Sequence, residues 1–168
     1  MPKRKFYGSR RNTQVTLEPE LAIAIIGITS SIADGDGLGH KEDYVLGEML
    51  CSMAGFEEYS EQDYVELHNR AVEILQQEGI DEAFNLAIAC LPNQDYKEAA
   101  YVTALVVIAC DGDVPDEEAE FLANLQDALN ISNKRAEEIF EEVYGEEEEE
   151  EETERQRKHK RRGKKGRR

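Results

Sequence analysis

Two short segments, LAIAIIGITSSIA at 21–33 and AAYVTALVVIAC at 99–110, are apolar on nearly every face of a helix. Each is well short of the roughly 20 residues that a helix needs to span a bilayer. A helix that is apolar all round must therefore be covered by other parts of the same fold. We expect both segments to form central buried helices that pack against each other.

The rest of the chain between residues 17 and 145 repeats apolar residues at helical spacing, and it lacks both sustained alternation and hairpin turns between β-branched runs. The sequence therefore predicts an all-α domain of about seven helices over residues 17–145. The expected helices run over 17–33, 41–55, 61–79, 81–91, 97–110, 115–129 and 133–143.

Local signals indicate how several of these helices begin, end and face the core. Ser60 and Asp63 have the spacing of a capping box, Gly79 is expected to end that helix, and Asp81 is expected to cap the next one. His68 lies on the apolar stripe of the third helix, where we expect a hydrogen-bonded core residue rather than a ligand. The last helix is expected to bury Ala136, Ile139, Phe140 and Val143.

Two stretches of the chain have the same plan, SSIADGDGLGHKEDYVLGEML at 30–50 and VVIACDGDVPDEEAEFLANLQ at 106–126. They align on the DGD triplet when Gly37 is counted as a one-residue insertion. Each copy reads as a buried helix, an acidic turn and an amphipathic helix. We therefore predict a pseudo-twofold bundle built from two helix-turn-helix repeats.

The two acidic turns are candidate sites for a divalent cation. Ca²⁺ and Mg²⁺ prefer oxygen ligands, and carboxylates offset the cost of dehydrating such ions. The alternative is that acids in a first helical turn only stabilise the helix dipole, which explains Asp116 and Glu117 fully. The candidate ligands are Asp34, Asp36 and Glu42 from the first turn and Asp111, Asp113 and Glu118 from the second.

The phrases SIADGDGLGHKE and IACDGDVPDEEAEFLANLQDALNIS, followed by AEEIFEEV, resemble the tellurite-resistance TerB-like domain family over about residues 17–145. The resemblance implies an all-helical fold with an internal repeat, a role in stress responses, and paired acidic turns that bind divalent metal ions. Asp34, Glu42, Asp111 and Glu118 match the acids of the family motif. Cys110 stands where the family usually has Ala, and Gly37 is an insertion in the first turn.

The charge of the chain is strongly segregated. Residues 1–16 form a basic arm, the domain is acidic, and residues 146–168 combine a Glu run with a tail that has ten Lys/Arg in its last 14 residues. We expect the 146–168 segment to be disordered, since it has no apolar residue with which to build a core. An acidic domain repels phosphate backbones and attracts cations or basic partners.

Three functions remain open at this stage. The first is a non-enzymatic cation-binding domain, since no histidine has a spacing typical of a nucleophile or a zinc site. The second is weak, non-specific and salt-sensitive contact with nucleic acid through the basic tail. The third is an acidic helical scaffold for an unknown protein partner.

The sequence favours the cytoplasm as the compartment. Its three Cys residues lack metal-ligand spacing, and it shows no signal or transmembrane segment.

Overall fold

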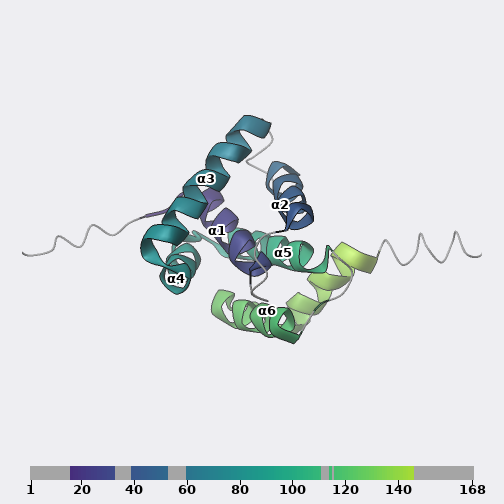
Figure 1. Ribbon diagram of the computed structural model, residues 1–168. Helices are drawn as coiled ribbons and strands as arrows, with labels where there is room; N and C mark the ends of the chain where they lie inside the picture. Colours follow the sequence, from purple (N-terminus) through teal and green to yellow (C-terminus); the bar gives the residue numbers. More distant parts are fainter. Residues whose placement is uncertain (1–15, 33–38, 53–59, 111–113, 115, 146–168) are drawn as a thin grey trace, which may run out of the picture.

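The computed structural model describes residues 16–32, 39–52, 60–110, 114 and 116–145. Within these ranges the protein has seven helices and no strand, which confirms the predicted all-α fold (Figure 1). The expected disordered tail lies outside the described residues. The helices are α1 Pro19–Ser31, α2 His40–Ser52, α3 Glu61–Glu78, α4 Ile80–Cys90, α5 Gln94–Ala109, α6 Asp116–Leu129 and a C-terminal helix over 133–145.

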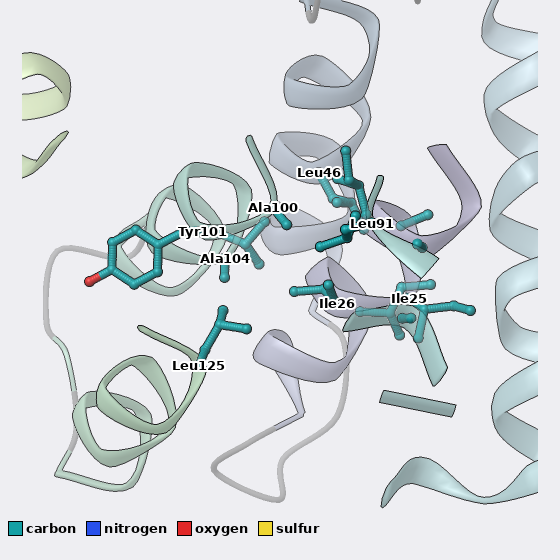
Figure 2. Close-up of a cluster of buried hydrophobic side chains, with 14 of the residues drawn as sticks. Ile25, Ile26, Leu46, Leu91, Ala100, Tyr101, Ala104 and Leu125 are labelled. Carbon is teal, nitrogen blue, oxygen red and sulfur yellow. The ribbon is translucent and has the colours of Figure 1, made fainter. Parts of the chain in front are cut away.

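Helix α1 is the centre of the fold. Every residue from Leu21 to Ser31 is buried, and α1 contacts each of the helices α2 to α6. Its most extensive contact is with α5, so the two apolar helices pack together as predicted. Figure 2 shows Ile26 of α1 beside Ala100 and Ala104 of α5, with Leu125 of α6 pointing toward the same cluster.

The two expected repeats correspond to the pairs α1–α2 and α5–α6, and the helices of each pair contact each other. Helix α2 also packs against α5, and α6 contacts α1, so each amphipathic helix meets both apolar ones. A pseudo-twofold relation between the two pairs stays a prediction.

Hydroxyl groups at the C-terminal end of α1 are buried without loss of hydrogen bonding. The Thr29 hydroxyl donates to the carbonyl of Ile25 at 2.7 Å. The Ser30 and Ser31 hydroxyls donate to the carbonyls three residues earlier, at 2.6 and 2.8 Å. Buried hydroxyls are tolerated when they are bonded in this way, so α1 can stay inside the fold up to the start of the first acidic turn.

The helix ends confirm some of the local signals and contradict one. The Ser60 and Asp63 capping box is present, with Ser60 N–H donating to the Asp63 carboxylate at 2.8 Å. That bonding lowers the pKa of Asp63, chiefly through the Ser60 hydroxyl. Gly79 ends α3 with a φ of 89° and is also the N-cap of α4. The expectation that Asp81 caps α4 is therefore wrong, because Asp81 already lies in its first turn.

Helix α5 begins at Gln94, three residues before the predicted start at Lys97. The Asn93 side chain accepts a hydrogen bond from Tyr96 N–H at 3.1 Å and so satisfies one of the backbone donors that a helix start leaves open. The Asn93 cap directly after Pro92 was the signal that the sequence analysis overlooked.

Arg135 links the C-terminal helix to α5. Its guanidinium donates to Glu98 of α5 at 3.0 and 2.9 Å, to Glu142 at 3.0 Å and to Glu138 at 3.3 Å. These carboxylates, Glu98 foremost, raise the pKa of Arg135. The helix thereby gains an ionic link to α5 in addition to its apolar contacts.

The predicted burial of Phe140 is wrong. Its side chain is 53% exposed, whereas the preceding Ile139 is 1% exposed. Consecutive residues of a helix point about 100° apart, and this helix turns Ile139 rather than Phe140 toward the core. The Phe140 ring lies instead against Tyr144, with 5.0 Å between ring centroids.

Gly27 should be essential to the packing of α1, and we predict that Gly27→Ala destabilises the domain by about 1–3 kcal/mol. A Cβ at Gly27 would lie 2.4 Å from Leu46 Cδ1 and 3.3 Å from Thr103 Cγ2, and both neighbours are fully buried. This crowding outweighs the gain of about 1 kcal/mol in helix propensity. The free energy of unfolding in urea measures the effect.

Gly145→Ala is the matched control, since a Cβ there would meet nothing within 4 Å. It should leave stability unchanged or raise it slightly. If the Gly27→Ala protein were as stable as the Gly145→Ala protein, the side chains of Leu46 and Thr103 would be able to move aside without loss of stability.

Candidate functional site

Most of the predicted ligands of the acidic turns lie outside the described residues. This holds for Asp34, Asp36, Asp111 and Asp113, and also for the side chain of Glu42, whose backbone belongs to α2. Glu118 in α6 is the predicted ligand whose side chain is described. Among the described residues, no group of three or more His, Cys, Asp or Glu side chains is placed to hold a metal ion. The expected convergence of the two turns therefore stays a prediction.

Glu118 differs from its acidic neighbours in its position on α6. Asp116 and Glu117 are exposed, as expected for acids that stabilise the helix dipole, but Glu118 is only 5% exposed. It occupies the core-facing stripe of α6, one turn before the buried Leu122 and two before Leu125. Glu118 also makes a polar interaction within the chain. Its carboxylate is thus held at the inner face of α6, five residues after Asp113.

A second polar cluster lies where α2 meets α3, and the sequence analysis did not predict it. The Tyr64 hydroxyl donates to the Asp43 side chain at 2.8 Å and lies 3.0 Å from the Asp43 carbonyl. His68, one turn after Tyr64 on α3, has its Nε2 atom 3.5 Å from the same Asp43 Oδ1. The Tyr64 and His68 rings are 6.0 Å apart. An acid, a phenol and an imidazole are therefore gathered between two helices.

The expectation for His68 is correct in position and wrong in bonding. The side chain is 24% exposed on the inner stripe of α3, but its Nε2 atom is buried without a hydrogen-bond partner among the described residues. Its distance from Asp43 Oδ1 exceeds the 2.7–3.2 Å or so of an N–H···O hydrogen bond. His68 is therefore a half-buried histidine with one unsatisfied nitrogen that faces a carboxylate.

Gly47 determines how closely Tyr64 can approach α2. A Cβ on Gly47 would lie 3.3 Å from two atoms of the Tyr64 ring, closer than ordinary van der Waals contact. Gly47 is one turn after Asp43 on α2, so the ring lies over the glycine while its hydroxyl reaches Asp43. The spacings of Asp43 with Gly47 and of Tyr64 with His68 are visible in the sequence, but the register of α2 against α3 is not.

Comparisons of the chain with protein-family models, with curated proteins and with solved structures found no match. None of the described helices combines the length and the apolar character that a membrane span requires.

The hydrogen bond from Tyr64 to Asp43 should contribute measurably to stability. We predict that Tyr64→Phe lowers the free energy of unfolding by about 1 kcal/mol, because the bond to a charged acceptor is lost while the ring is kept. Urea denaturation measures the change. Tyr44→Phe is the control, since Tyr44 is 68% exposed, and it should change stability by less than about 0.5 kcal/mol. Equal effects of the two substitutions would contradict the assigned role of the Tyr64 hydroxyl.

Proposed function

We propose that this protein is a non-enzymatic, TerB-like domain that binds a divalent cation of the Ca²⁺ or Mg²⁺ class at the turn between α5 and α6. Asp111, Asp113 and Glu118 are the proposed ligands. The observation that carries the proposal is the burial of the Glu118 carboxylate on the core-facing stripe of α6, five residues after Asp113 and seven after Asp111.

Burial of the Glu118 carboxylate has an energetic cost. Removing an ionised carboxylate from water costs several kcal/mol unless charges or hydrogen bonds compensate it. The N-terminal end of a helix contributes only about 0.3–1 kcal/mol, up to about 2 kcal/mol when partly buried. The nearby Asp111 and Asp113 add negative charge to the same turn. Glu118 already makes a polar interaction within the chain, and a bound cation would add to it and would offset this repulsion.

The cation class follows from the ligand atoms. Three carboxylates supply only oxygen donors, which suit hard ions such as Ca²⁺ and Mg²⁺ better than ions that prefer nitrogen or sulfur. The first turn, with Asp34, Asp36 and Glu42, would form the other half of the site if the repeat brings the two turns together. On the resemblance to the TerB-like family, we assign such a domain a role in stress responses, including tellurite resistance.

The test compares two neighbouring acids that differ in burial. In full-length protein stripped by a chelator, Ca²⁺ or Mg²⁺ should raise the melting temperature, since binding to the native state alone adds about 2.7 kcal/mol at 100 times the Kd. Glu118→Gln should weaken cation affinity at least about tenfold, or about 1.4 kcal/mol, in a calorimetric titration. Glu117→Gln removes the same charge from an exposed position and should change affinity little.

Two results would contradict the proposed cation site. Identical cation responses of the Glu117→Gln and Glu118→Gln proteins would indicate diffuse screening of an acidic surface rather than a site. The advantage of wild type over Glu118→Gln in stability should also grow as the cation concentration rises. A constant difference would mean that Glu118 has a structural role only.

A further inference from the structure

We propose that the basic N-terminal arm of this chain docks on the outer side of the seam between α2 and α3, two helices that lie next to each other in the fold (Figure 1). The docking surface consists of the exposed residues Tyr44 on α2 and Val65 on α3. The segment that binds it is KRKFYGSRR at 3–11. The contact lies within one molecule, and it does not depend on the cation site proposed for the α5–α6 turn.

On α2, Tyr44 lies beside the row of residues that faces α3. That row consists of Asp43, which accepts a hydrogen bond from Tyr64, and Gly47, which lies against the Tyr64 ring. Successive residues of a helix are rotated by about 100°, so the buried Leu46 lies on one side of the row and Tyr44 on the other. Tyr44 is therefore on the solvent side of the seam.

Val65 occupies the equivalent position on α3. Tyr64 and His68 form the row that faces Asp43 of α2. The same rotation of about 100° places the buried Leu67 on the core side of this row and the half-exposed Val65 on its outer side. The two helices thus present one aromatic and one aliphatic side chain along the same side of a single seam.

The charges around this surface are mostly negative. Glu48 lies one turn after Tyr44, Glu61 lies one turn before Val65, and both acids are exposed. Lys41, one turn before Tyr44, has the opposite charge. A segment that fits this surface should therefore combine apolar side chains with positive charge.

The N-terminal arm has that chemistry. Phe6 and Tyr7 stand between the basic runs KRK and RR, and the segment 3–11 contains no acid that could neutralise them. Aromatic rings bury a large apolar area, and opposite charges steer a segment toward its surface. The basic tail at 155–168 has no apolar residue, so it lacks the part that would cover the exposed side chains of the seam.

The arm also joins the domain beside α3. The Glu18 carboxylate pairs with Arg70 of α3 at 2.9 Å, and Leu17 is buried. Arg70 is five residues after Val65, or about 7.5 Å along the helix. Ten extended residues span up to about 33–36 Å, so Tyr7 can reach the seam from Leu17. A short tether gives an effective concentration of roughly millimolar, so a weak contact is enough for docking.

The test follows the arm in full-length protein. A photoreactive benzoylphenylalanine in place of Phe6 should cross-link to α2 or α3 within one molecule, as mapped by peptide mass spectrometry. Val65→Lys should lower the yield at least about threefold, because it removes an apolar contact and repels the arm. Phe140→Lys is the matched control, since Phe140 is 53% exposed and Val65 50%, and it should leave the yield unchanged.

The methyl groups of Val65 give a second readout without any change in the domain. The double substitution Phe6→Ala and Tyr7→Ala removes both rings and should shift the Val65 methyl resonances in an NMR spectrum. Those of Val114, which is exposed before α6, should not move. Unchanged Val65 resonances would overturn the proposal, as would equal cross-linking yields of the Val65→Lys and Phe140→Lys proteins. Cross-links found only in products of two molecules would overturn it in favour of a second copy as the partner.

Discussion

The fold depends on the burial of α1, a helix that has no polar face. Its residues from Leu21 to Ser31 are all buried, so other helices must surround it on every side. Helices α2 to α6 all contact α1. An amphipathic helix can cover part of α1 with a single apolar stripe. Gly27 brings Leu46 of α2 and Thr103 of α5 against α1 at the same point. The position of α2, and with it the contact of α2 with α3, therefore follows from how α1 is covered.

Several features of the fold could be predicted from local signals in the sequence. Pro19 at the first position of α1, the Ser60 and Asp63 capping box and Gly79 at the end of α3 act within one turn of the backbone, so they can be recognised without the structure. Phe140 shows the limit. Helical spacing allows either Ile139 or Phe140 to face the core, and the packing of the last helix against α5 decides between them.

The candidate sites were less predictable, because they depend on contacts between helices. The acid at position 118 was expected from the motif, but its burial depends on how α6 lies on the core. The contact of Asp43 with His68 joins residues 25 positions apart, and its geometry requires Tyr64 to lie against Gly47. The spacing of residues along one helix does not reveal how α2 and α3 are aligned against each other. Short-range patterns therefore indicated the acids of the proposed cation site and overlooked the contact between α2 and α3.

Glu118 and His68 are two polar side chains whose positions in the fold local sequence patterns do not explain. A helix that buries a carboxylate on its core face, or leaves an imidazole nitrogen without a partner, is less stable than one with apolar residues there. Such exceptions are expected at functional sites, where stability is given up for chemistry. Glu118 also makes a polar interaction within the chain, so the proposed cation would add to that interaction rather than replace it.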